Sequence, residues 1–144
     1  METLLISLHP RHSKKVFSGE KTIELRKRPV RKDNKMRLTF DHILIYETLP
    51  TAAIVGYCKT TCRVFYKNAQ DYCNNHQKRL CLTSREIWEY LGDRMGYGIE
   101  IKNPQRITPI PLSKMRELKI LPPQGFRYLS DTDLEKLGVK FFND

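Results

Sequence analysis

The feature that most constrains this chain is a series of short apolar or alternating segments, each of strand length and each following closely on the last. Residues 3–8 form an apolar run that is too short for a helix of its own, which indicates a buried strand. Residues 21–27 alternate strictly between two faces, which predicts a strand with one face toward the core. The expected strands are residues 3–8, 21–27, 42–47, 52–65, 97–102 and 107–110.

Two of these assignments concern long stretches in the middle of the chain. Residues 52–65 are rich in β-branched side chains and predict one long strand, with Gly56 as the place for a bend. Residues 66–82 are polar, and their pattern leaves open whether they form a helix or a lid.

Short helices separate some of the strands. Pro10 suits a first helical turn and Gly19 suits the position after the last turn, so residues 11–18 are expected to be helical. Further helices are expected at residues 84–91, 111–118 and 130–137, the last of them ended by Gly138.

The expected helix at residues 84–91 has a defined start and an apolar side. Ser84 is the predicted N-cap because its hydroxyl can accept a hydrogen bond from a free backbone N–H of the first turn. The apolar side consists of Ile87, Trp88 and Leu91.

The order of the segments predicts an α+β fold, because strands mostly follow one another without long crossovers. We expect a small mixed β-barrel of five to six strands with three to four short helices. The 144 residues suit a single domain.

Positive charge is concentrated near the start of the chain. The net charge is +10, and residues 9–37 contain eleven Lys or Arg against three acids, or +8 of that total. Such a stretch is either a solvated face or a site for a polyanion; we favour the polyanion because the rest of the chain is almost neutral. RNA or a nucleotide-like ligand is the partner that this charge predicts.

Other sequence features argue against several classes of protein. No stretch approaches the ~18 apolar residues of a membrane span and no signal-peptide pattern is present, so a cytoplasmic, non-membrane protein is expected. Cys58, Cys62, Cys73 and Cys81 lack C-x-x-C spacing, which predicts free thiols and no metal site. We expect no cofactor and a monomer.

Several segments together resemble the ASCH family of the PUA-like superfamily. They are residues 5–10, 18–28, 53–56 and 97–101, with residues 122–128 similar to a C-terminal extension of many members. The resemblance implies one ASCH/PUA-like domain over residues 1–144, with its core at 3–110 and an extension at 111–144. It also implies a cleft between the first helix, the strand after the Gly-Lys turn and facing loops. ASCH domains are proposed to bind RNA, often in transcription or translation, and some members are ribonucleases or hydrolyse acetylated cytidine.

The candidate site is the turn and strand at residues 19–26. Lys21 follows Gly19 at the start of a strand, where its ammonium group can supply a phosphate contact. Glu24 and Arg26 lie on one strand face, either as a simple ion pair or as groups that grip a base and a phosphate.

Further residues are expected to surround or close this cleft. Lys14, Lys15, Arg28, Arg31 and Lys32 provide a cationic field, and His9 ends the first strand nearby. Candidate stacking platforms are Tyr46, Tyr57 and Tyr97, and candidate closing residues are Gln124, Arg127 and Tyr128. The other histidines, His12, His42 and His76, have no obvious partners in the sequence.

Four functions stay open at this stage. RNA binding without chemistry leads, and the alternatives are a ribonuclease on single-stranded RNA, an amidohydrolase on acetylated cytidine, and a protein-binding adaptor. If the chain is a hydrolase, Lys21 and Glu24 are the candidate catalytic residues. Lys21 matches the catalytic lysine of the amidohydrolases that it resembles, but Glu24 stands where they have a threonine. The downstream glutamate of those enzymes could correspond to Glu86 or Glu89.

Overall fold

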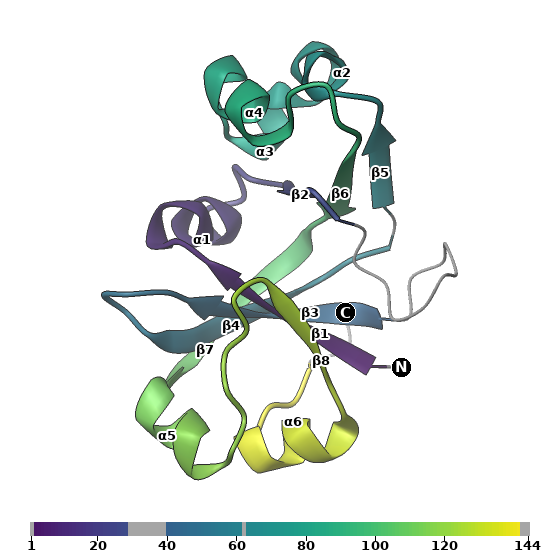
Figure 1. Cartoon of the computed structure of the whole chain (residues 1–144). Coiled ribbons are helices and arrows are strands. Elements are labelled where there is room, and N and C mark those ends of the chain that lie inside the picture. The colour runs from purple at the N-terminus through teal and green to yellow at the C-terminus, as the bar shows by residue number, and fades with distance from the viewer. Residues whose placement is uncertain (1, 29–39, 62, 142–144) are drawn as a thin grey trace.

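Two β-sheets and three groups of helices build the protein in the computed structural model, which describes residues 2–28, 40–61 and 63–141 (Figure 1). The described strands are β1 (Glu2–Leu8), β2 (Ile23–Arg26), β3 (Phe40–Glu47), β4 (Ala53–Lys59), β5 (Arg63–Tyr66), β6 (Gly96–Glu100), β7 (Lys102–Pro111) and β8 (Phe126–Leu129). The described helices are α1 (Pro10–Phe17), α2 (Ala69–Asn75), α3 (Gln77–Leu80), α4 (Ser84–Leu91), α5 (Leu112–Glu117) and α6 (Asp131–Leu137).

The larger sheet has the strand order β7-β4-β3-β1-β8. Strands β1 and β3 are parallel, and the other neighbours are antiparallel. Both faces of β1 are covered: Leu4 and Ile6 belong to one hydrophobic cluster, and Leu5 to another on the opposite face. Burial on both faces explains why this segment is a continuous apolar run instead of an alternating one.

The smaller sheet, β2-β6-β5, is antiparallel and lies under helices α2, α3 and α4 (Figure 1). A third cluster fills the space between this sheet and those helices, with Ile23, Leu25, Tyr72 and Ile87 among its buried residues. The chain passes from β6 through Ile101 directly into β7, and so from the smaller sheet into the larger one. Helices α5 and α6 cover the far face of the larger sheet (Figure 1).

The expectation of a mixed α+β fold is confirmed, but the expected barrel is wrong. The described strands form two separate sheets, and these sheets do not close on one another. The described residues also contain eight strands and six helices, where five to six strands and three to four helices were expected. One extra strand arises because the predicted segment 52–65 is divided into β4 and β5. The other is β8, a short strand without alternating apolar and polar residues.

The predicted long strand at residues 52–65 is one such division. Its first part is β4 of the larger sheet and its last part is β5 of the smaller one. The Thr60 N–H donates to the Asp41 carbonyl at 3.0 Å, which ends β4 beside the start of β3. The strand pairing does shift register next to Gly56, where the bend was expected.

The helices follow the predicted positions with small corrections. Residues 66–82 contain the two short helices α2 and α3. Thr83, not Ser84, is the N-cap of α4, since the Thr83 side chain accepts from the Glu86 N–H and Glu86 accepts from the Thr83 N–H. Trp88 is 40% exposed and therefore does not belong to the buried side of this helix.

Some predictions fall on residues that the structure does not describe. These are the cationic residues Arg31, Lys32, Lys35 and Arg37, together with Cys62. Within the described ranges, no helix is both long and apolar enough to cross a lipid bilayer.

Candidate functional site

The turn between α1 and β2 holds Lys21 in a buried position. Gly19 adopts φ +84°, a conformation that favours glycine, and the Lys21 N–H donates to the Lys15 carbonyl at 2.9 Å. The Lys21 side chain is only 1% exposed, and its Nζ donates to the Leu80 carbonyl at 2.7 Å. A buried ammonium group is costly unless its donors are used, so the two remaining N–H groups favour further polar partners.

Lys21 faces a hollow of about 300 Å³, and this hollow alone is called the pocket below. Its walls come from the end of β1, helix α1, strand β2 and helix α4. The lining residues are Ser7, Leu8, His9, His12, Lys21, Glu24, Leu25, Arg26, Leu82, Glu86 and Tyr90. This volume lies at the lower end of the range for small-molecule sites, and the lining mixes apolar walls with a few polar groups.

Glu24 and Arg26 bring opposite charges into the pocket. The Arg26 Nε lies 3.9 Å from the Glu24 Oε1, and the side chains are 16% and 12% exposed. Among the described residues, the buried Glu24 Oε2 and Arg26 Nε have no hydrogen-bond partner. An unsatisfied buried polar atom costs about 1–3 kcal/mol, so a ligand that supplies both a donor and an acceptor would be favoured here.

His12 is a site residue that the sequence did not reveal. It lines the pocket from α1, and its pKa is lowered by burial first and by the Lys21 cation second, while the nearby Glu24 opposes this shift. A lowered pKa keeps the imidazole neutral near pH 7, so it can accept a proton. The missed signal was helical spacing, because His12 lies four residues before the buried Val16 on the inner side of α1.

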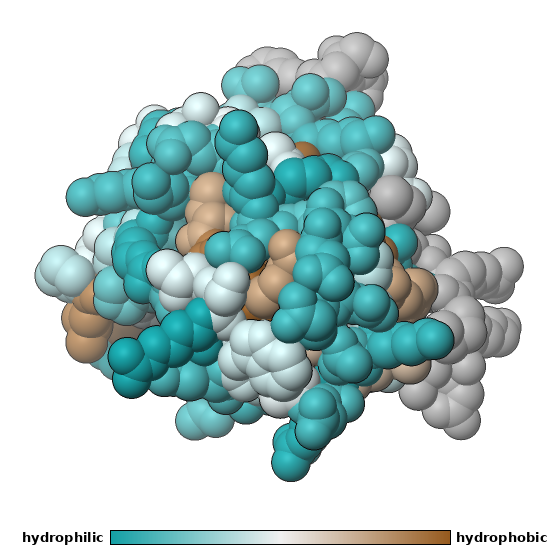
Figure 2. Space-filling model, turned by 90° about the horizontal axis from the view of Figure 1, so that it is seen from above, coloured by the Kyte–Doolittle hydropathy of each residue, from teal (hydrophilic) through white to brown (hydrophobic). Residues whose placement is uncertain are grey.

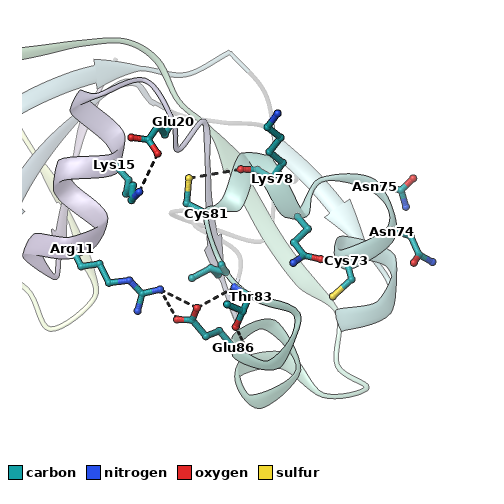
Figure 3. A pocket seen from close by; sticks show the side chains of 12 residues that line it. Arg11, Lys15, Glu20, Cys73, Asn74, Asn75, Lys78, Cys81, Thr83 and Glu86 are labelled. Carbon is teal, nitrogen blue, oxygen red and sulfur yellow. Dashed lines mark hydrogen bonds and ion pairs between the residues drawn. The ribbon is translucent and has the colours of Figure 1, made fainter.

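A wider groove adjoins the pocket, and Figure 3 shows it between α1 on one side and α2 and α3 on the other. Its volume is about 850 Å³. The lining residues are Arg11, Lys15, Glu20, Cys73, Asn74, Asn75, Gln77, Lys78, Cys81, Leu82, Thr83 and Glu86. We call this hollow the groove; it shares Leu82 and Glu86 with the pocket.

Ion pairs line the groove. The Lys15 Nζ lies 3.0 Å from a Glu20 carboxylate oxygen, and the Arg11 Nη2 lies 2.7 Å from one of Glu86 (Figure 3). Seen from the α2–α4 end, the surface is mostly hydrophilic, with small hydrophobic patches between the charged and polar side chains (Figure 2).

The remaining predicted cations divide between the groove and open surface. Lys15 lines the groove, whereas Lys14 and Arg28 are exposed and line neither hollow. His9 lines the pocket, and its side chain caps α1 by accepting from the Arg11 N–H at 3.2 Å.

The predicted stacking residues lie away from the pocket. Tyr46 and Tyr57 are buried in the cluster beneath α5 and α6. Tyr97 packs edge-on against Phe65 in the smaller sheet, with ring centroids 5.5 Å apart.

The same holds for the predicted closing residues. The Arg127 Nη1 donates to the Leu121 carbonyl at 3.1 Å, Gln124 is exposed, and Tyr128 packs against Phe40. The structure does not bring any of these three into the lining of the pocket.

Two other histidines have partners that the sequence did not show. His42 stacks on Phe141 with ring centroids 4.0 Å apart and contacts the Asp41 carboxylate. His76 forms a hydrogen bond with the Tyr66 hydroxyl. Neither of these histidines lines the pocket or the groove.

The cysteines and acidic residues form no metal centre in the described part of the chain, where no three His, Cys, Asp or Glu side chains gather to hold an ion. Cys58, Cys73 and Cys81 are free thiols. Burial raises the pKa of Cys58 to about 12, which makes this thiol unreactive near neutral pH. Of the two alternative glutamates, Glu86 lines the pocket, whereas Glu89 is exposed and pairs with Arg85.

Comparison with known proteins gives relatives that match nearly the whole chain. No protein-family model matches it. A curated protein of Zymomonas mobilis subsp. mobilis, named an ASCH domain-containing ribonuclease, is 25% identical over 136 residues, which cover 92% of this chain and 88% of the relative.

Solved structures agree with this relationship. The crystal structure of ASCH from Zymomonas mobilis has a TM-score of 0.82 at 26% identity, covering 94% of this chain and 93% of that chain. A serine-to-alanine mutant of that protein gives 0.79 at 25% identity, with 94% of each chain covered. The N-terminal domain of Staphylothermus marinus McrB, with a TM-score of 0.56 at 9% identity over 94% of this chain and 92% of that one, shares only the fold.

Proposed function

This chain carries an ASCH domain, and from that premise we propose that it binds RNA with one nucleotide in the pocket beside Lys21. The observation that carries the proposal is the gathering of buried Lys21 with the mostly covered Glu24 and Arg26 around one pocket of about 300 Å³. The name of the curated relative, a ribonuclease, supports RNA as the ligand.

The pocket chemistry suits a nucleotide. Lys21 and Arg26 supply cations for phosphate oxygens, and the unpaired Glu24 Oε2 can accept from the amino group of a base. The exposed cations of α1 add a field that attracts the RNA backbone over a longer range.

Binding to a labelled single-stranded RNA at several salt concentrations tests the proposal. The logarithm of the affinity should fall linearly with the logarithm of the salt concentration, because phosphate contacts release counterions. No binding to any RNA, or binding that salt leaves unchanged, would contradict it.

A second candidate function is cleavage of single-stranded RNA, and His12 favours it. Burial and the Lys21 cation lower the pKa of His12, so its neutral imidazole can take the proton of a ribose 2′-hydroxyl. The 2′-oxygen then bonds to the adjacent phosphorus, and the bond from phosphorus to the 5′-oxygen breaks. The products are a 2′,3′-cyclic phosphate and a 5′-hydroxyl, whose oxygen takes a proton from water while His12 releases its own to solvent. Lys21 and Arg26 stabilise the charge on the phosphate oxygens.

Product analysis separates this chemistry from binding alone and from the amidohydrolase alternative. An RNA with 2′-deoxyribose at the cleavage position should bind but stay intact, and the His12→Ala protein should bind RNA without cleaving it. Acetylated cytidine, incubated in parallel, should stay acetylated; its deacetylation would support the amidohydrolase in place of the ribonuclease.

Other expectations from the sequence stay predictions. They are a single domain over residues 1–144, a monomeric state, a cytoplasmic location and a role in transcription or translation. A protein that binds no RNA but captures an acidic protein partner would support the adaptor alternative.

A further inference from the structure

The pocket and the groove are neighbouring hollows. Leu82 and Glu86 line both of them, so the shortest way for a chain molecule from the pocket to the groove passes these two residues. The groove has about 850 Å³ against about 300 Å³ for the pocket, which leaves room for more than the group held by Lys21.

Arg11 and Glu86 meet at this junction. The Arg11 Nη2 donates to both carboxylate oxygens of Glu86, at 2.9 and 2.7 Å, and the two side chains are 52% and 31% exposed. Arg11 comes from α1 and Glu86 from the first turn of α4, so the pair bridges the two walls (Figure 3).

Glu86 has a second partner that holds its carboxylate in place, whereas the guanidinium group of Arg11 has none among the residues that the structure describes. Glu86 also accepts from the Thr83 N–H at 3.0 Å, and this bond, followed by the one from Arg11, lowers the pKa of Glu86. The cap of α4 therefore holds the carboxylate in place without Arg11. The guanidinium group of Arg11 has only Glu86 as a side-chain partner within the described ranges. A guanidinium group that pairs with a carboxylate in this way can pair with a phosphate in the same geometry.

We infer that Arg11 is the phosphate contact at which an RNA chain leaves the pocket and enters the groove, and that Glu86 occupies Arg11 until a phosphodiester displaces it. This inference rests on the proposed function and adds a second nucleotide subsite to it. Glu86 thereby acts as a built-in competitor, which weakens the binding of a ligand whose phosphate must displace it from Arg11.

The rest of the groove suits the next nucleotide. Lys78 forms no ion pair with a described carboxylate and is exposed, so it is available to a phosphate. The amide side chains of Asn74, Asn75 and Gln77 add donors and acceptors of the kind that read base edges in single-stranded RNA.

The test compares two variants that break the same ion pair in opposite ways. Glu86→Gln keeps the cap of α4, because glutamine serves at this position as well as glutamate, and it frees Arg11. We expect this variant to bind a single-stranded RNA pentamer about fivefold more tightly, and Arg11→Ala to bind it about fivefold more weakly, since one exposed charged contact is worth about 1 kcal/mol. Arg11 does not line the pocket, so Arg11→Ala should weaken the binding of a nucleoside monophosphate less than that of the pentamer, as an NMR titration would measure.

Matched controls exist on α4, the helix that carries Glu86. Arg85 and Glu89 form an exposed ion pair on α4 outside both hollows, at 2.9 Å. Arg85→Ala and Glu89→Gln change the net charge as the test variants do, and both should leave the pentamer affinity within twofold.

Three outcomes would overturn the inference while leaving the proposed function intact. Arg11→Ala and Glu86→Gln could shift the pentamer affinity in the same direction, which would make the pair structural. The control variants could change the pentamer affinity as much as the test variants do, which would mean that net charge alone causes the changes. The wild-type protein could bind the monophosphate as tightly as the pentamer, which would leave the groove without a role. A wild-type protein that binds neither ligand would overturn the proposed function itself.

Discussion

The pocket and the groove lie side by side, yet they hold their charged groups in different ways. In the pocket, Lys21 is 1% exposed, and Glu24 and Arg26 keep buried atoms without partners among the described residues. In the groove, Lys15 and Glu20 are 44% and 57% exposed and are already paired with one another. Water solvates the groove charges at little cost, whereas the pocket charges are fixed and stay costly until a ligand satisfies them. Burial, and not the number of charges, thus marks the place where specific contacts are expected.

The same contrast holds along the cationic stretch of the sequence. Lys14, Lys15 and Arg28 contribute as much formal charge as Lys21, Arg11 and Arg26 do. The fold turns Lys14 and Arg28 to open solvent and encloses Lys21 between α1, β2 and the carbonyl of Leu80. A charge count along the sequence therefore finds the region but not the residues.

The largest effect is expected for Lys21→Met, which removes the buried cation. We expect RNA affinity to fall by about 1.5–3 kcal/mol, the typical value of a hydrogen bond to a charged group, or roughly 10- to 150-fold. Fluorescence anisotropy with labelled RNA measures this loss. Because the variant also leaves the Leu80 carbonyl unpaired, a thermal melt must show that it is folded at the assay temperature.

Lys14→Ala is the matched control, since it removes an exposed cation from the same stretch. Its affinity should stay within about twofold of the wild type. If Lys21→Met and Lys14→Ala lost the same amount of RNA affinity, a buried cation in the pocket would contribute no more to binding than an exposed one.

The next effect concerns the support of α1, the helix that contributes side chains to both hollows. Gly56 lies beneath α1, and a Cβ atom there would meet the Phe17 ring at 2.5 Å and the Gln105 carbonyl oxygen at 2.4 Å. Gly56→Ala should lower the free energy of unfolding by about 1–3 kcal/mol, the usual cost of overpacking a core. Urea denaturation monitored by circular dichroism measures the change.

Gly125→Ala is the control for this substitution. Its added Cβ would find only the Arg26 Nη1 within 4 Å, at an ordinary 3.8 Å. The unfolding free energy should change by less than about 0.5 kcal/mol, as for other substitutions that disturb no packing. A Gly56→Ala protein as stable as this control would show that α1 is free to move away from the sheet.

A pH profile of RNA cleavage sharpens the assignment of His12. Its lowered pKa means that the neutral base persists below pH 6.5. The cleavage rate should therefore rise about tenfold per pH unit in acid and become constant at higher pH, because only the neutral imidazole accepts the proton. The midpoint of this transition should lie below pH 6.5. A midpoint above pH 6.5, or an unchanged profile in His12→Ala, would contradict a role for His12 as the base.

The smallest effect is expected in the groove, from Glu20→Gln. This change frees Lys15 from an exposed carboxylate and should raise RNA affinity by less than about threefold at low salt. At 1 M salt the Debye length shortens to about 3 Å, so this gain should vanish while the loss in Lys21→Met persists. Two effects that decline equally with salt would contradict the distinction between a buried contact and a screened one.

Local patterns predicted most secondary-structure elements well. The apolar run of β1, the alternation of β2 and the capped helices α1, α4 and α6 depend on residues within one or two turns of each other. The prediction failed at residues 52–65, because the chain changes sheets between Lys59 and Arg63, where no proline or glycine signals the break. The predicted barrel was wrong for a related reason: the order of strands along the chain does not say which strands share hydrogen bonds.

The sequence by itself determined the cationic stretch, the Gly19 turn and the placing of Lys21, Glu24 and Arg26 in one short strand region. Only the tertiary structure decided that Lys21 is buried, that His12 and Glu86 join it, and that Tyr46, Tyr97 and Arg127 do not. The reason is distance along the chain, since the Leu80 carbonyl that holds the Lys21 ammonium is 59 residues away. Glu86 of α4 reaches Arg11 of α1 across 75 residues, through a side-chain ion pair. Periodicity reports which side of an element faces the core, but the meeting of two distant elements depends on how their faces pack together.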